Sequence, residues 1–280
     1  MKITSLSRPL VAAVAVAALA LGIVAGLACT GASGARSPWR SWTTLRLEAK
    51  AMPLFRGQVE MAVGEKAGER RLETWATARF LGVIIARSRT ETVFEPGTGR
   101  TKSYNSYSPK RGRRYAFGDR SYVVEKLRPP EEEDAPPEEW EVTSRKEFPY
   151  PEGDPAFRLF DYYGMLLHLR EAELNEPGDE VTLHVATSKG AQPYRIVVSE
   201  SRESDRTYDD LATGTTKTLP LVEFRLRIIP ADPANASEGF LRMEGETEVW
   251  VEADSKTPLE ISGKVPKVPG RVRLILAGMG

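Results

Sequence analysis

The feature that most constrains the fold is a two-residue alternation of apolar and polar side chains. The clearest case is residues 221–229, "LVEFRLRII". There the apolar residues Val222, Phe224, Leu226 and Ile228 alternate with the charged residues Glu223, Arg225 and Arg227. Similar runs are "TTLRLEAKAM", "RLETWATARFLGVIIARSRTETVFE", "TEVWVEA" and "RVRLILA". Because a strand points successive side chains to opposite faces, each run predicts a strand with one dry face and one wet face.

Turn sequences such as "EPGTGR" and "NEPGDE" separate these runs. Many strands with few helices predict a mainly β fold: a strongly curved antiparallel sheet or half-open barrel with one main helix on its concave face. The helix is predicted over residues 155–173, with Asp154 as its N-cap and Pro155 at its first position. Its apolar face should cover the dry side of the sheet.

The chain divides into three predicted segments. Residues 1–28 read as a signal peptide of the lipoprotein type, residues 29–40 as a tether, and residues 41–280 as a single curved-sheet domain. Within the domain, the acidic and proline-rich stretch 128–153 predicts a long solvated loop. A division into two domains at this stretch is the less favoured interpretation, since neither half alone has an obvious way to cover its sheet.

The N-terminal segment carries the single cysteine, Cys29, so no intramolecular disulfide can form. Residues 10–28 carry no charge, and positive residues precede them, as in secretory signal peptides. The sequence "GLAC" at 26–29 resembles the bacterial lipobox, although Gly26 stands where leucine is usual. This resemblance implies that Cys29 is a lipid attachment site. Cleavage after Ala35 and a retained membrane helix containing Cys29 are the alternatives.

All three readings of this segment place the remaining chain outside the cytoplasm. We expect the bacterial cell envelope, on the periplasmic side, with membrane anchoring through a lipid on Cys29. Lysine plus arginine equals aspartate plus glutamate, 39 each, so the whole-chain charge indicates no nucleic-acid partner. The two histidines, His168 and His184, form no motif, and the chain has no zinc-protease, nucleophile-elbow or phosphate-loop signature. No cofactor and no metal are expected, and the oligomeric state is left open.

The order of several short motifs then matters. The first motif, in residues 161–170, consists of Asp161, Leu166, Leu169 and Arg170. The second is Gly178-Asp179. The third, near the end of the chain, consists of Trp250, Asp254, Pro258 and Ile261. This series resembles the bacterial envelope family known as domain of unknown function 3108, over roughly residues 42–278. Gly164 stands where that family commonly has serine. The family is similar to LolA- and LolB-like carriers and receptors of lipoprotein sorting, which implies a curved sheet whose helices cover an apolar hollow, and it supplies no activity.

The prediction that follows is a non-enzymatic envelope lipoprotein that binds an apolar or amphipathic ligand, such as a lipid or a lipoprotein acyl chain. The hollow should be lined by the helix residues Leu159, Tyr163 and Leu167 and by the strand residues Val222, Phe224, Leu226 and Ile228. A filled core with no room for a ligand is the plain alternative. Two other functions stay open: a structural or assembly partner in the envelope, and a glycan hydrolase that uses two facing carboxyl groups.

Overall fold

The computed structural model describes residues 42–52, 55–66, 68–95, 99–130, 135–150, 158–232, 240–266 and 270–280. Its helical elements are α3 (Tyr162–His168) and the 3-10 turns η1 (Pro137–Glu139), η2 (Leu169–Glu171) and η4 (Phe240–Arg242). Its strands are β1 (Thr44–Met52), β2 (Phe55–Lys66), β3 (Glu69–Phe80), β4 (Val83–Phe94), β5 (Thr101–Ser108), β6 (Arg111–Phe117), β7 (Ser121–Arg128), β8 (Glu141–Pro149), β9 (Leu159–Phe160), β10 (Glu180–Thr187), β11 (Gly190–Asp210), β12 (Thr216–Pro230), β13 (Glu244–Glu252), β14 (Pro258–Lys264) and β15 (Arg271–Met279).

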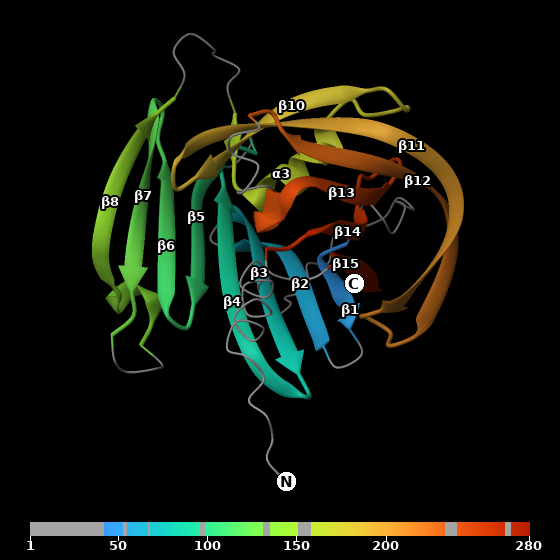
Figure 1. Cartoon of the computed structure of the whole chain (residues 1–280), viewed down its shortest axis with the longest axis horizontal. Helices are drawn as coiled ribbons and strands as arrows, with labels where there is room; N and C mark the ends of the chain where they lie inside the picture. Colours follow the sequence, from blue (N-terminus) through green and yellow to red (C-terminus); the bar gives the residue numbers. More distant parts are fainter. Residues whose placement is uncertain are drawn as a thin grey trace.

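The described strands join into one 15-stranded sheet in the order β8-β7-β6-β5-β4-β3-β2-β1-β15-β14-β13-β12-β11-β10-β9. Neighbouring strands follow one another along the chain, except where the first and last strands meet, with Leu45 of β1 opposite Met279 of β15. In Figure 1 the strands β5 to β8 form a wall on one side, while the long strands β11 and β12 arch over the other side. The sheet therefore wraps around its own concave face.

The sheet closes on itself where the end of β11 reaches β15. Asp209 and Asp210 pair in parallel with Gly278 and Met279, and the amide of Leu211 donates to the carbonyl of Met279 at 2.9 Å. Strands β11 to β15 thus form a closed ring, and β1 to β8 extend from β15 as an open sheet that ends in the wall of β5 to β8. The prediction of a mainly β, strongly curved fold is confirmed. The sheet is mixed rather than purely antiparallel, because β9–β10 and β11–β15 pair in parallel.

One continuous apolar core fills the concave side, and α3 lies within the curve of the strands (Figure 1). Leu45, Leu226 and Ile228 are fully buried on the sheet side, and Met165 and Leu169 are fully buried beneath the helical segment. Burial stabilises the fold by roughly 1.5–3 kcal/mol for each large apolar side chain. The core thus supplies the cohesion that a domain without a disulfide requires.

The predicted helix over residues 155–173 is wrong in its extent. Leu159 and Phe160 pair in parallel with β10 as the short strand β9, and α3 begins only at Tyr162. The N-cap is Asp161, whose Oδ1 accepts hydrogen bonds from the amides of Tyr163 at 2.9 Å and Gly164 at 3.1 Å. Pairing with β10 overrides the helical spacing of Leu159. The predicted cap at Asp154 and Pro155 lies outside the described residues.

The predicted loop over residues 128–153 is also wrong in part. Residues 137–139 form η1, and residues 141–149 form β8, which pairs antiparallel with β7. As an outer strand of the sheet, β8 exposes most residues on both of its faces. It therefore lacks the apolar alternation by which the other strands were predicted.

The faces of β12 follow the prediction over only part of its length. Phe224, Leu226 and Ile228 are buried, as the alternation predicts. Glu223, predicted to be wet, is fully buried, and Val222, predicted to be dry, is 41% exposed. Leu219 and Leu221, on the same face as Glu223, pack against the core. A curved strand of 15 residues cannot keep one face toward the core throughout, so its dry face changes near Glu223.

Candidate functional site

The residues predicted to line a hollow lie in different places. Tyr163 joins the three buried residues of β12, Phe224, Leu226 and Ile228, in the main core, and Leu167 packs against that core while partly exposed. Leu159 belongs to a separate apolar cluster, and Val222 is exposed. The structure thus brings five of the seven residues together. Cys29 and the segments 1–28 and 29–40 lie outside the described residues.

A second apolar cluster lies between the wall formed by β5 to β8 and the strands β9 to β11. Its centre is Tyr122 of β7, which is fully buried and stacks against Phe117 at 5.8 Å, Phe148 at 5.2 Å and Tyr150 at 6.3 Å between ring centroids. The Tyr122 hydroxyl donates to the carbonyl of Thr187 at 3.0 Å, which ties the wall to the end of β10. These stacked rings form a rigid aromatic surface.

A small pocket opens beside this aromatic stack. It combines aromatic, aliphatic and charged side chains, and its lining consists of Glu95, Arg100, Thr101, Phe117, Gly118, Tyr150 and Leu159. Its cavity volume is about 10 Å³, which is room for about one water molecule. Sites that enclose a whole drug-sized ligand span roughly 300–1,000 Å³. A ring, a headgroup or the end of a chain would therefore enter only if the lining side chains moved apart.

Thr101 is the most unusual polar group in this lining. The residue is 4% exposed, and within the described part of the chain its hydroxyl has no hydrogen-bond partner. A buried polar group without a partner costs about 1–3 kcal/mol. A ligand that offered a hydrogen bond to Thr101 would remove this cost.

Tyr150 supplies a second polar group. Burial raises the pKa of its phenol to about 12, and this effect outweighs the opposing influence of the Arg100 guanidinium, while Asp119 and Glu95 raise the pKa further. The phenol is therefore protonated throughout the physiological range and can donate a hydrogen bond. The pocket offers an aromatic face, one buried hydroxyl and a cation beside a carboxylate, which is an amphipathic lining.

A buried carboxyl group follows close along the chain. Asp161, two residues after Leu159, is fully buried, and its Oδ2 has no hydrogen-bond partner among the described residues. Burial raises the pKa of Asp161 to about 6, although the amides of Gly164 and Tyr163 favour its charged form. Its free oxygen explains the nearby glycine, because a Cβ on Gly164 would lie 2.6 Å from Oδ2.

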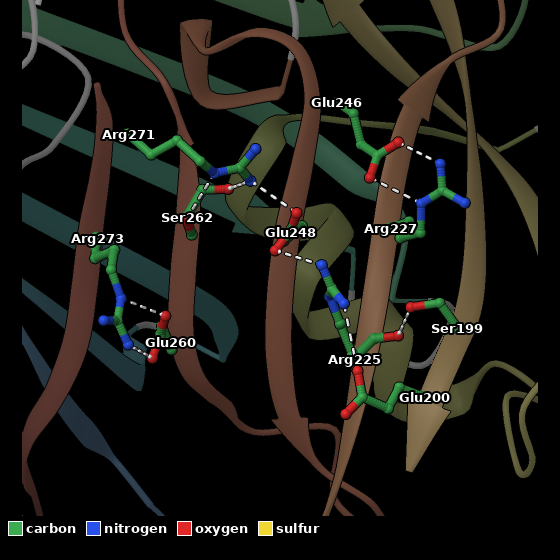
Figure 2. A network of polar contacts seen from close by, with 10 residues as sticks. All are labelled: Ser199, Glu200, Arg225, Arg227, Glu246, Glu248, Glu260, Ser262, Arg271 and Arg273. Atoms are coloured by element: carbon green, nitrogen blue, oxygen red, sulfur yellow. Dashed lines mark hydrogen bonds and ion pairs between the residues drawn. The ribbon is translucent and has the colours of Figure 1, made fainter. Parts of the chain in front are cut away.

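The outer face of the ring carries a different polar arrangement, drawn in Figure 2. Arg225 lies between Glu200 at 3.3 Å and Glu248 at 3.0 Å, and Glu248 also meets Arg271 at 3.1 Å. The pairs Arg227–Glu246 and Arg273–Glu260 are both bidentate. The four arginines and four glutamates of this network balance in charge. We interpret the network as cross-strand support, since its charges are already paired.

Trp250 and Arg170, which belong to the short motifs of the resemblance to domain of unknown function 3108, make packing contacts with charged and aromatic side chains. The guanidinium of Arg202 stacks 3.6 Å from the ring centroid of Trp250 and binds the buried carboxylate of Glu223. Arg170 lies 4.8 Å from the ring centroid of Trp42, and burial lowers its pKa to about 10, with Arg70 adding to this effect. These motifs therefore fix packing across the sheet.

His168 contacts an aromatic ring and a carboxylate. His168 stacks on Phe160 at 4.6 Å, and its Nδ1 lies 3.2 Å from Glu171. Among the described residues, no three histidine, cysteine or acidic side chains are grouped so that they could hold a metal ion. No helix within the described ranges is long and apolar enough to cross a membrane.

Sequence reasoning missed the aromatic pocket. A signal was available, since tyrosines and phenylalanines recur in β5, β6, β7 and β8. The sequence alone does not indicate the contact between this wall and β9, because the spacing of apolar residues in that segment predicts a helix.

The comparisons with known proteins agree with this architecture. A crystal structure described as a beta-barrel-like protein of domain of unknown function DUF1849 from Brucella abortus matches with a TM-score of 0.50 and 9% sequence identity, over 84% of this chain and 95% of that chain. At this identity the likeness concerns the fold alone. A search of curated proteins finds no match. The model of the family "Protein of unknown function (DUF3108)" matches residues 53–276, and the chain therefore belongs to the DUF3108 family.

Proposed function

We propose that this protein is a non-enzymatic lipoprotein of the bacterial cell envelope that binds an amphipathic ligand at the aromatic pocket. The observation that carries this proposal is the pocket itself, in which the buried, unpaired hydroxyl of Thr101 lies among aromatic and aliphatic side chains. The main core under α3 is the weaker candidate, since its residues Tyr163, Leu226 and Ile228 are buried against one another.

The chemistry of the lining supports an amphipathic ligand rather than a purely apolar one. Phe117, Tyr150 and Leu159 offer an apolar wall, while Arg100 and Thr101 offer a cation and a hydroxyl. Pockets of this kind use a few polar groups to orient a ligand that is otherwise held by apolar contact. An anionic or hydroxyl-bearing end with an attached ring or chain would satisfy both parts of the lining.

A pair of substitutions tests the ligand site. Thr101→Val replaces the unpaired hydroxyl by a methyl group of similar size, and Thr74→Val does the same at an equally buried, unpaired hydroxyl of β3 outside the pocket. With a dansyl-labelled fatty acid as the probe, we expect saturable binding that Thr101→Val weakens about fivefold to tenfold through the lost hydrogen bond. Thr74→Val should leave the affinity unchanged.

Two results would count against the ligand site. The first is an absence of saturable binding by protein from which lipid has been removed. The second is binding that Thr101→Val and Thr74→Val alter equally. Native mass spectrometry of protein purified without detergent adds an independent readout, since a ligand-binding protein should retain a co-purifying small molecule.

Membrane anchoring forms a separate part of the proposal and depends on Cys29. Cys29→Ser should accumulate as unprocessed precursor, because bacterial lipoproteins are anchored through acyl chains on that cysteine. Ala35→Leu is the matched control for ordinary cleavage after Ala35. If Cys29→Ser yields mature protein with unchanged membrane affinity, the anchor is not on Cys29.

An assembly role is the second candidate, favoured by one observation. Strand β8 is at the end of the sheet order, and its Val142 is 46% exposed. An open strand edge can accept a further strand from a partner protein. Lys146 and Arg145, both in β8, place charged side chains on this edge strand. This function would be supported instead if the purified protein holds no small molecule and binds an extended peptide along β8.

A further inference from the structure

The tip of the β3–β4 hairpin is apolar and exposed. Phe80 pairs with Val83 across a two-residue turn made of Leu81 and Gly82. Leu81 is 62% exposed and Val83 is 66% exposed, the two largest values among the large apolar side chains described. In Figure 1 this hairpin ends at the lowest point of the coloured sheet. The tip therefore presents its apolar side chains away from the core.

The turn chemistry does not account for this leucine. Leu81 has φ 51° and Gly82 has φ 82°, so both central residues adopt the left-handed region, as in a type I′ turn. Asparagine, aspartate and glycine suit the first of these positions, and leucine is strained there. A residue that is both unfavourable for the turn and costly to expose suggests that its side chain has a contact of its own to make.

Three arginines lie on the outer face just behind the tip: Arg56 of β2, Arg79 of β3 and Arg87 of β4. Arg56 and Arg79 are directly opposite each other, and Arg87 is opposite Thr77, two residues from Arg79. All three are exposed, and within the described part of the chain none forms an ion pair. Like charges placed directly opposite destabilise a sheet unless an anion neutralises them.

The same sheet provides a comparison. On the outer face of β11 to β15, Arg225, Arg227, Arg271 and Arg273 are all paired with glutamates (Figure 2). Near the β3–β4 tip, Arg56 and Arg79 have no carboxylate directly opposite them, and the row of Arg87 reaches a carboxylate only at Glu48 of β1, three strands away. The positive charge behind the tip is thus uncompensated, in contrast to the balanced charge of the ring.

From these observations we infer that the β3–β4 tip, with Arg56, Arg79 and Arg87, binds the surface of an anionic lipid bilayer. Leu81 and Val83 enter the apolar boundary of the bilayer, and the arginines meet lipid phosphates. Apolar side chains in front of basic ones are the arrangement by which proteins bind in the plane of such an interface. The inference is independent of the ligand pocket, because the tip shares no residue with it.

The test uses the full chain in a Cys29→Ser background, so that an introduced cysteine is the only one. Val83→Cys carries an environment-sensitive NBD probe, and the same probe at Ala212→Cys, in the exposed β11–β12 turn, is the matched control. The protein is reconstituted into phosphatidylcholine vesicles with and without phosphatidylglycerol. We expect the emission at position 83 to shift to the blue and to be quenched by nitroxide-labelled lipid only with phosphatidylglycerol, with no change at position 212.

Two sets of variants separate the apolar and charged contributions. Leu81→Asn suits the turn better, so its melting temperature should be equal or higher while insertion of the probe is lost. Arg56→Gln, Arg79→Gln and Arg87→Gln should each lower the ratio of inserted to free tip roughly fivefold. The inference is overturned if the probes at 83 and 212 respond alike, or if Leu81→Asn inserts as well as the parent. A blue shift that needs no vesicles and grows with protein concentration also overturns it, in favour of contact with a second copy.

Discussion

Two fully buried carboxyl groups are held in opposite ways. Asp161 keeps one oxygen without a partner among the described residues, and burial raises its pKa to about 6. Glu223 accepts hydrogen bonds from Arg202, Arg206 and Ser204. Burial alone would raise the pKa of Glu223, but these hydrogen bonds outweigh it and hold the pKa below its ordinary value. The two residues therefore make opposite contributions to the dependence of stability on pH.

Asp161→Asn should remove the contribution of Asp161. Because the folded pKa of about 6 lies above the ordinary 3.8, the stability that this group contributes is complete below pH 4 and is lost as the pH rises to about 6. Asparagine remains a good N-cap and carries no charge. We expect Asp161→Asn to match the parent near pH 4 and to exceed it by about 1–3 kcal/mol at pH 8, as measured by urea unfolding.

The control for this prediction is Asp161→Ala, which removes the charge and the cap together. Loss of an N-cap costs about 0.5–2 kcal/mol at every pH. A difference between Asp161→Asn and the parent that stays constant from pH 4 to pH 8 would show that Asp161 does not titrate with a raised pKa.

Glu223→Gln should have the opposite dependence. The lowered pKa means that stability from Glu223 is complete above about pH 4.5 and is lost as the pH falls through the folded pKa. Removing one partner from a buried ion pair costs up to about 3–5 kcal/mol, and the partly exposed Arg202 reduces this to about 2–4 kcal/mol. The deficit should be greatest at neutral pH and shrink under acid conditions in urea unfolding.

Glu180→Gln serves as the comparison, because Glu180 and its partner Arg195 are 54% and 50% exposed. Exposed ion pairs contribute about 0.2–1 kcal/mol. Equal losses for Glu223→Gln and Glu180→Gln would mean that the burial of Glu223 has no energetic consequence.

At the scale of the element, α3 shows how a short helix is specified by its first turn. Asp161 caps it, and Gly164 leaves space for the carboxyl group that does so. Its buried residues include Tyr163, Met165 and Leu166. With only seven residues, such a helix is stable because of packing and capping rather than intrinsic propensity.

Substitutions at Gly164 test this arrangement. A Cβ there would lie 2.6 Å from Oδ2 of Asp161 and 3.4 Å from Phe94, so Gly164→Ala should cost about 1–3 kcal/mol through overpacking. Gly164→Ser meets the same crowding, but its hydroxyl can donate to the unpaired Oδ2. We therefore expect Gly164→Ser to lose about 1 kcal/mol less than Gly164→Ala in thermal or urea unfolding. The opposite order would exclude that hydrogen bond.

Individual elements also show what the sequence can predict. Strands β3 and β15 alternate clearly because each has one face on the core, and β12 does so from Phe224 onward, so their positions follow from the pattern. Strand β8 has both faces exposed, so no periodic pattern marks it. The short strand β9 has two residues and depends on its partner β10, which no local signal reveals. The pocket between β9 and the aromatic wall was unpredictable for the same reason.

At the scale of the whole molecule, ring closure joins segments far apart in the chain. Arg46 of β1 binds Asp209 of β11 at 2.9 Å, beside the parallel pairing of β11 with β15. A parallel contact of this kind depends on the curvature of β11 and β12, each of which is long enough to bend across the ring. The alternation of apolar and polar residues predicts where the strands lie and which of their faces is buried. Whether the sheet closes into a ring depends on how the curvature of many strands adds up.

Gly278 provides a test of the closure. A Cβ at this position would lie 2.7 Å from Leu211 and 3.2 Å from the guanidinium of Arg46, so Gly278→Val should force the end of β11 away from β15. We expect a loss of about 1–3 kcal/mol. Hydrogen exchange of the Leu211 amide, which donates to the carbonyl of Met279, should accelerate, while amides of β3 and β4 keep their protection.

Gly64→Val is the matched control for this prediction. Gly64 is also a strand glycine, but no atom lies within 4 Å of its would-be Cβ, and valine favours a strand. Its stability should be unchanged or slightly higher, and exchange at Leu211 should stay slow. If Gly278→Val and Gly64→Val behave alike, the contact of β11 with β15 does not hold the ring closed. If Gly278→Val instead accelerates exchange across β11 to β15 together, the ring opens as one cooperative unit rather than at its seam alone.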